Sequence, residues 1–294
     1  MEPQALIIRS AGTNCDRELM HAFELAGAGT CGVHINELIE KPHLIEKADL
    51  IGFPGGFSYG DDIAAGRILA NRLRHRLMEP LKEAIKCNVP MIGICNGFQV
   101  ITKMGLLPDA EAGRQQATLA DNASGRFTDK WISLTVPEHT VCIWTRGLTS
   151  LDLPIAHGEG RFVPESDDLL RFWQESGQIA LRYATASSTQ DSGRMTQDSP
   201  TFPGNPNGSV DDIAGVCDAT GLVLGLMPHP ERFTHPTHHP LWSRRSPGEL
   251  DEPPAGLRLF QNAVEFVRVK IAEKQRKQEM AQAQAPNVGG MGVS

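Results

Sequence analysis

Residues 91–99 read MIGICNGFQ, an apolar run that ends at Cys95, which lies between Gly93 and Gly97. The run has the composition of a buried strand, and a helix-like apolar spacing begins directly after the cysteine. A nucleophile flanked by glycines at a strand-to-helix junction is the layout of a hydrolase nucleophile elbow, here with cysteine in place of serine. A buried cysteine in a close-packed spot is the alternative, and these nine residues alone do not decide between the two.

The predicted helix after Cys95 would favour its reactive form. The amide dipoles at the helix N-terminus point at the sulfur and stabilise the thiolate, which is the attacking species. The amide of Asn96 is placed to donate to an oxyanion, and Gln99 lies one turn further along the same crevice.

Short apolar runs alternate with helical patterns through the first hundred residues. This alternation predicts a parallel sheet covered on both faces, with its ligand crevice beyond the carboxyl ends of the strands. The predicted elements are strands at residues 5–10, 31–35, 49–53 and 91–94, and a long helix over residues 63–87.

The second half of the chain is richer in strands. We predict them at residues 131–136, 141–144, 179–183, 212–217 and 222–227. A final helix is indicated by an apolar stripe of Leu257, Phe260, Val264, Val267 and Ile271. The domain is expected to cover residues 1–272, with a polar loop insertion at about 186–203 and a frayed or disordered tail over 273–294.

A thiolate nucleophile needs a base, and the base needs a group that orients it. The apolar run at 222–227 is followed by the sequence Pro-His-Pro-Glu, in which the histidine is His229 and the glutamate is Glu231. Flanking prolines favour extended backbone, which would place both side chains on the same side of the chain. The carboxylate can then hold one imidazole nitrogen and leave the other to serve Cys95. A loop histidine with a chance acidic neighbour is the alternative.

Gly55 and Gly56 follow the predicted strand at 49–53. Two glycines after a strand allow backbone amides to approach a reacting carbonyl oxygen. We therefore predict that the Gly56 amide donates a second oxyanion hydrogen bond beside that of Asn96. A structural turn is the alternative.

Composition limits the partners and the compartment. The formal net charge of −7 argues against a nucleic acid or an anionic membrane as partner. No apolar run approaches the roughly 18 residues of a membrane span, and the first residues show no signal-peptide pattern. We therefore expect a cytoplasmic protein with reduced thiols. Four of the six cysteines are expected to fill the core: Cys31, Cys87, Cys142 and Cys217.

The cysteine and histidine spacings do not favour a metal site. The cysteines lack paired C-x-x-C spacing, and the histidines at 229, 235, 238 and 239 are interleaved with prolines that make convergence awkward. We therefore predict no metal site.

The motifs together resemble those of the class I, or triad, glutamine amidotransferases. The resemblance is carried by GICNGFQ around Cys95, MPHPER around His229 and Glu231, and the Pro-Gly-Gly loop. Four stretches look like the glutaminase branch of phosphoribosylformylglycinamidine synthase in purine biosynthesis: GGFSYGDD at 55–62, IAHGEGRF at 155–162, NPNGS at 205–209 and GLMPHPER at 225–232. The resemblance covers about residues 5–266.

The resemblance implies a flavodoxin-like α/β fold, in which a mostly parallel central sheet has helices on both faces. It implies that Cys95 attacks the side-chain amide carbon of glutamine, that His229, oriented by Glu231, relays protons, and that water hydrolyses the thioester to glutamate. The implied substrate-binding residues are Gly55, Phe57, Gln99, His157 and Arg161. For Arg161, pairing with the substrate carboxylate and a structural or interface ion pair remain equal alternatives.

The resemblance also implies a partner. Ammonia would pass to a large synthetase subunit for the ATP-dependent conversion of formylglycinamide ribonucleotide to formylglycinamidine ribonucleotide, with a small accessory subunit left open. The chain has no GxxxxGK[ST] phosphate loop, so no cofactor is expected in it, and ATP and magnesium are assigned to the synthetase. Weak glutaminase activity alone, stimulated in the complex, is expected. A glutaminase serving another synthetase, and a partner-binding or metal-binding protein without glutaminase activity, are the alternatives.

Overall fold

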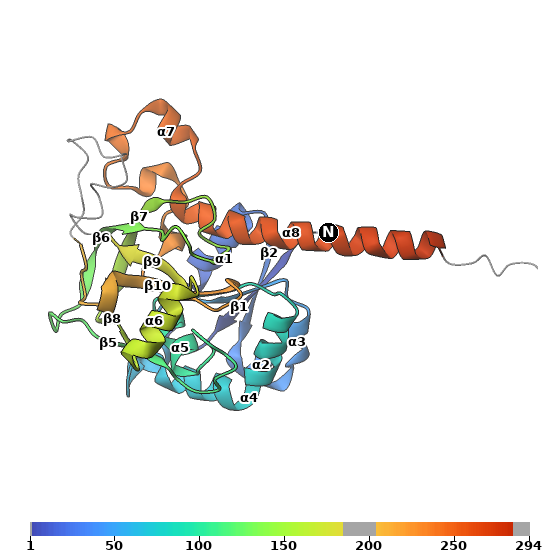
Figure 1. Cartoon of the computed structure of the whole chain (residues 1–294), viewed down its shortest axis with the longest axis horizontal. Coiled ribbons are helices and arrows are strands. Elements are labelled where there is room, and N and C mark those ends of the chain that lie inside the picture. Colours follow the sequence, from blue (N-terminus) through green and yellow to red (C-terminus); the bar gives the residue numbers. More distant parts are fainter. Residues whose placement is uncertain (1, 185–203, 285–294) are drawn as a thin grey trace, which may run out of the picture.

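The computed structural model describes residues 2–184 and 204–284 of the 294-residue chain. They form a central sheet with helices on both sides, and the C-terminal half of helix α8 extends away from it (Figure 1). The strands are β1 (Gln4–Arg9), β2 (Gly29–His34), β3 (Leu50–Phe53), β4 (Met91–Ile94), β5 (Ala117–Asp121), β6 (Thr128–Thr135), β7 (Ser150–His157), β8 (Glu159–Pro164), β9 (Ile179–Tyr183), β10 (Ile213–Cys217) and β11 (Val223–Leu226). The helices are α1 (Asp16–Leu25), α2 (Ile35–Glu40), α3 (His43–Glu46), α4 (Arg67–Lys86), α5 (Asn96–Lys103), α6 (Asp167–Glu175), α7 (Pro247–Asp251) and α8 (Ala255–Gln284).

The main sheet has nine strands in the order β2-β1-β3-β4-β11-β10-β9-β6-β7. The five strands from β2 to β11 pair in parallel, and the remaining strands pair antiparallel. Strands β5 and β8 form a separate antiparallel ribbon. The predicted α/β fold with a parallel central region is thus confirmed, and β4 and β11, which carry the two main motifs, lie side by side.

The parallel strands have apolar residues on both faces because helices cover both sides of the sheet. Strands β3, β4 and β11 are buried along their whole length. Consecutive residues of β3 show the two layers: a Cβ on Gly52 would meet Leu19 of α1, whereas Phe53 lies against Gly97 of α5. Helix α8 packs beside α1, where Phe23 and Phe260 meet edge to face at 5.1 Å.

The glycines around Cys95 are explained by close packing of helix α5 on the sheet. A Cβ on Gly97 would lie 1.9 Å from the backbone oxygen of Phe53, and a Cβ on Gly93 would lie 2.9 Å from the backbone oxygen of Gly97. Neither glycine has a positive φ. Both glycines are therefore required because a side chain would not fit at either position. The residue with the unusual backbone torsion is Cys95.

The strand predicted at residues 141–144 is wrong. This segment is irregular, and its amides at Val141 and Ile143 donate to Gly177 and Gly221 rather than to a sheet ladder. Its apolar character reflects burial, since Trp144 is fully buried and donates its ring N–H to the Leu222 carbonyl. Strands β5, β7 and β8 and helix α6 were not predicted.

Two cysteines expected in the core lie on the surface. Cys31 and Cys87 are exposed, whereas Cys142 and Cys217 are buried as expected. The exposed pair sits at an edge strand and a helix end, where a neighbouring apolar residue does not ensure burial.

The chain beyond the domain differs from the sequence expectation. Residues 273–284, assigned to a frayed or disordered tail, continue helix α8, because Ala, Gln, Glu, Lys and Arg are good helix formers even without an apolar stripe. The polar insertion at about 186–203 lies outside the described residues. In the described ranges, no helix is both long and apolar enough to cross a membrane.

Gly97→Ala tests the packing of α5. The added methyl group would clash with the Phe53 carbonyl, so we expect the free energy of unfolding to fall by about 1–3 kcal/mol. Urea unfolding followed by circular dichroism measures the change. Gly248→Ala is the matched control, because a Cβ there meets nothing within 4 Å. Equal unfolding midpoints for both variants would contradict the packing argument.

Candidate active site

Cys95 occupies the turn between β4 and α5 with φ 51° and ψ −108°. A non-glycine residue at positive φ is uncommon and costs on the order of 1–3 kcal/mol, so the surrounding structure must hold it. The Cys95 amide donates to the Leu226 carbonyl at 2.8 Å, which fixes the turn to the neighbouring strand β11. The predicted sharp turn between strand and helix is present, and Cys95 lines a cavity of about 340 Å³.

His229 and Glu231 follow strand β11, and His229 lines the same cavity. His229 Nδ1 lies 2.7 Å from Glu231 Oε1, and both side chains are buried. The pairing agrees with the sequence prediction, but its geometric reason differs. Residues Pro230–Arg232 form a short 3₁₀ turn rather than extended chain, and this turn brings the carboxylate beside the ring.

The triad residues meet around Gly55. A Cβ at Gly55 would lie 3.0 Å from His229 Cε1 and 3.5 Å from Cys95 Cβ, so only a glycine allows the loop to pass between them. Among the described residues, His229 Nε2 has no hydrogen-bond partner. The ring nitrogen opposite Glu231 is therefore available for proton transfer.

The charges around His229 favour its protonated form. Burial, the largest effect, opposes protonation, but the carboxylate of Glu231 and the nearby sulfurs of Cys95 and Cys15 together raise the pKa of His229 well above its ordinary value. A protonated imidazole beside a cysteine is the arrangement that supports a thiolate nucleophile.

The two residues predicted to bind an oxyanion flank the same space. Gly56 has φ 137°, a conformation open to glycine, and forms an isolated bridge with Thr13 at the edge of the cavity. Asn96 is the first residue of α5, so its amide has no partner within the helix. The Asn96 side chain receives the Ser58 amide at 3.2 Å and donates to Asp61, which ties this helix end to the loop after β3.

The predicted substrate-binding residues divide into two groups. Phe57, Gln99 and His157 line the cavity, and Gly55 lies between the side chains of Cys95 and His229. Arg161 is not part of the cavity wall. It lies in β8, with its side chain against Gly208 and its Nε without a hydrogen-bond partner among the described residues. The structure therefore separates Arg161 from the residues it was grouped with.

His157 is a neutral ring in this cavity. Burial, with a contribution from the charge of His229, lowers the pKa of His157 to about 4. Its Nδ1 lies 3.0 Å from Asn122 Oδ1, and Asn122 also receives the Gly160 amide, so Nδ1 carries the proton and donates. Its Nε2 is left as a buried acceptor without a partner in the described part of the chain.

Several residues of the site were not found from the sequence. Cys15, Arg126 and Arg232 line the cavity with Cys95, and Lys103 forms an ion pair with Glu159 at 3.6 Å behind it. Cys15 lies at the N-cap of α1, after the loop that follows β1, and Arg232 follows Glu231 inside the MPHPER motif. Arg232 could have been found from its place in that motif, whereas no sequence signal marked Cys15.

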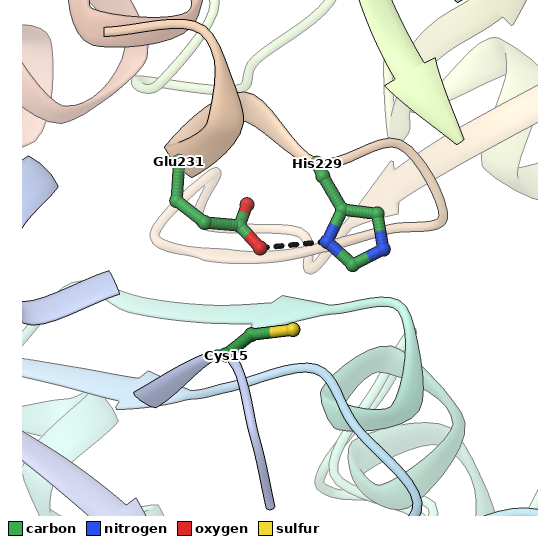
Figure 2. A group of neighbouring side chains, drawn as sticks. All are labelled: Cys15, His229 and Glu231. Atoms are coloured by element: carbon green, nitrogen blue, oxygen red, sulfur yellow. Dashed lines mark hydrogen bonds and ion pairs between the residues drawn. The ribbon is translucent and has the colours of Figure 1, made fainter. Parts of the chain in front are cut away.

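Cys15 is buried beside the His229–Glu231 pair (Figure 2). Arg232 donates to its sulfur at 3.2 Å and also binds Glu18 of α1 at 3.0 Å. Burial raises the pKa of the Cys15 thiol, and the lowering effects of His229 and Arg232 do not offset it. Cys15 is thus held as an uncharged thiol.

The histidine cluster considered from the sequence is not assembled as a metal site. In the described ranges, the one group of three or more His, Cys, Asp or Glu residues with converging ligand atoms is Cys15, His229 and Glu231. His239 instead packs edge to face on Trp131 at 4.9 Å.

The fold and this site define an α/β protein with a strained cysteine, an imidazole and a carboxylate at the carboxyl edge of a parallel sheet. The family model described as "CobB/CobQ-like glutamine amidotransferase domain" matches residues 2–267. A phosphoribosylformylglycinamidine synthase subunit PurQ of Dehalococcoides mccartyi is 42% identical over 265 residues, covering 90% of this chain and 98% of that protein. The subunit PurQ of Methanococcus maripaludis strain C5 is 38% identical, with 90% and 99% covered.

A solved structure is similar over the same range. A chain in the structure of PurLQS from Thermotoga maritima superposes with a TM-score of 0.65 at 30% identity, covering 91% of this chain and 100% of that one. The chain belongs to the glutamine amidotransferase family of phosphoribosylformylglycinamidine synthase PurQ subunits.

Glu231→Gln tests the electrostatics of His229. Because the carboxylate raises the pKa of His229, its loss should lower that pKa, and the imidazole titration observed by NMR should move to lower pH. In the unmodified protein the protonated ring stabilises the fold below its ordinary pKa, and this contribution is lost as the pH rises through the raised value. An unchanged titration midpoint in the variant would show that Glu231 does not set the charge of the ring.

Proposed function

We propose that this chain is the glutaminase subunit of phosphoribosylformylglycinamidine synthase, with Cys95, His229 and Glu231 as its catalytic residues. The observation that carries the proposal is the strained Cys95 turn, which shares one cavity with His229, the ring that Glu231 holds at 2.7 Å. The family membership supports the same reaction and the same pathway.

The site performs glutamine hydrolysis in two halves. The Cys95 thiolate attacks the side-chain amide carbon of glutamine, and the carbonyl oxygen becomes an oxyanion. Protonated His229 gives its proton to the amide nitrogen, the carbon–nitrogen bond breaks, and ammonia leaves a glutamyl thioester. Neutral His229 then takes a proton from water, which attacks the thioester and releases glutamate with the thiolate restored. Glu231 stabilises the imidazolium and keeps the ring oriented.

The backbone around Cys95 would stabilise the oxyanion. The amides of Gly56 and Asn96 approach the cavity from two different loops, and the positive end of the α5 dipole adds to their effect. Losing one such donor typically costs on the order of a hundredfold in rate.

Polar groups in the cavity are suited to the two ends of glutamine. Guanidinium groups that line the cavity come from Arg126 and Arg232, which favours them over Arg161 as partners of the substrate carboxylate. The neutral acceptor at His157 Nε2 and the carboxylate of Glu159 are suited to the amino group. The side-chain amide of Gln99 donates to the backbone carbonyl of Glu159 and accepts a hydrogen bond from the side-chain amide of Asn96. Gln99 therefore positions the cavity wall near Glu159.

The ammonia is used by a partner in this proposal. A large synthetase subunit would bind ATP and magnesium and aminate formylglycinamide ribonucleotide. Reconstitution with and without a small accessory subunit would decide whether such a subunit takes part. Support comes from the structure named PurLQS, to which this chain is similar along nearly its whole length. A cytoplasmic location is part of the same proposal.

Cys95→Ala tests the function directly. Because the thiolate starts glutamine cleavage and the partner uses ammonia, glutamine-dependent amination by the reconstituted complex should fall by at least about 10⁴-fold, whereas amination with added ammonium salt should persist. Product formation from formylglycinamide ribonucleotide is the measurement. The control Cys87→Ser removes an exposed thiol and should retain both activities. Survival of glutamine-dependent turnover in Cys95→Ala would reject the assignment.

A further inference from the structure

We propose that Cys15, His229 and Glu231 form an inhibitory binding site for zinc-type divalent cations. One sulfur, one nitrogen and one oxygen from these residues all lie within 4.8 Å of one another. They come from distant parts of the sequence. Cys15 lies at the start of α1, and the other two residues follow β11. Figure 2 shows the sulfur facing the imidazole–carboxylate pair.

The glutaminase reaction does not use all of these atoms. The reaction requires the His229 ring and the Glu231 oxygen that is hydrogen-bonded to Nδ1. The Cys15 sulfur and the second carboxylate oxygen have no role in it. Glu231 Oε2 is buried and has no hydrogen-bond partner among the residues described. A buried carboxylate oxygen without a partner is costly, and a cation would compensate it.

The donor set selects the class of cation. Thiolate, imidazole and carboxylate are ligands of zinc and of similar borderline-soft ions such as cobalt, whereas magnesium and calcium prefer oxygen ligands alone. Tetrahedral zinc with ligands at about 2.0–2.3 Å holds its ligand atoms roughly 3.3–3.8 Å apart. The observed spacing reaches this geometry with small side-chain shifts, and water would complete the coordination.

The charge balance also suits a divalent cation. Coordination releases two protons to solvent, one from the Cys15 thiol and one from His229 Nδ1, since a metal-bound thiol is deprotonated and a metal-bound imidazole is neutral. One thiolate and one carboxylate then neutralise the two positive charges of the ion. The guanidinium of Arg232, 3.2 Å from the sulfur, stabilises the thiolate.

Binding at this site stops glutamine cleavage through His229. The ion replaces the proton between Nδ1 and Glu231, so the ring keeps its remaining proton on Nε2 and cannot take one from water during thioester hydrolysis. The inhibition part of the proposal rests on the catalytic assignment above. Cation binding itself does not depend on that assignment.

The first test measures inhibition in the reconstituted complex. Zinc titration should abolish glutamine-dependent turnover, leave ammonium-dependent turnover intact, and be reversed by a chelator. Cys15→Ser removes the thiolate ligand, so the half-inhibitory zinc concentration, measured relative to the variant's own zinc-free rate, should rise by at least about tenfold. Cys87→Ser, which removes an exposed thiol, should leave it unchanged. Equal zinc sensitivity of the protein and Cys15→Ser would overturn the proposal.

The second test measures binding without catalysis. Cobalt added to the full-length Cys95→Ala variant should give the near-ultraviolet absorption of a cobalt–thiolate bond. Adding Cys31→Ser and Cys87→Ser removes the two exposed thiols, and the absorption should remain. Adding Cys15→Ser instead should abolish it. Two outcomes would contradict the site, even if the protein had no glutaminase activity. One is loss of the absorption in the variant without Cys31, Cys87 and Cys95, and the other is its survival in the variant without Cys15 and Cys95.

Discussion

The close approach of helix α5 to strand β3 is the constraint on which the site depends. No side chain fits between Gly97 and the Phe53 carbonyl, so the helix begins directly above the sheet. The chain must turn within a single residue between β4 and α5, and Cys95 takes a left-handed torsion to do so. The cost of that torsion is offset by burial of α5, whose residues from Asn96 to Thr102 are all buried.

Strand order supplies the rest of the site. Strand β11 is inserted next to β4 in parallel register, with Leu226 opposite Ile94, although the two strands are far apart in the sequence. Their carboxyl ends therefore lie side by side, which brings His229 to Cys95. The Leu226 carbonyl accepts a hydrogen bond from the Cys95 amide, so one backbone hydrogen bond links the strand that precedes His229 to the turn that carries Cys95. The 3₁₀ turn then places Glu231 behind the ring.

Much of this arrangement could be predicted because it depends on local patterns. The apolar runs gave the parallel strands, and glycine and proline spacing gave the elbow and the His229–Glu231 pair. The irregular segment at 141–144 could not be recognised, since burial of Trp144 produces the same apolar signal as a strand. Arg161 was grouped with the pocket because its neighbours in the motif belong there, but alternation along β8 directs adjacent side chains to different faces. Cys15 was overlooked because its proximity to His229 depends on the tertiary fold.

Trapping the acyl-enzyme is the most direct test of the central claim. The reconstituted complex would be mixed with glutamine, quenched in acid during turnover, digested and analysed by mass spectrometry. The account predicts a hydroxylamine-labile glutamyl group on the peptide that contains Cys95. A glutamyl group on the Cys15 peptide, or turnover with no glutamyl thioester on any cysteine, would contradict it.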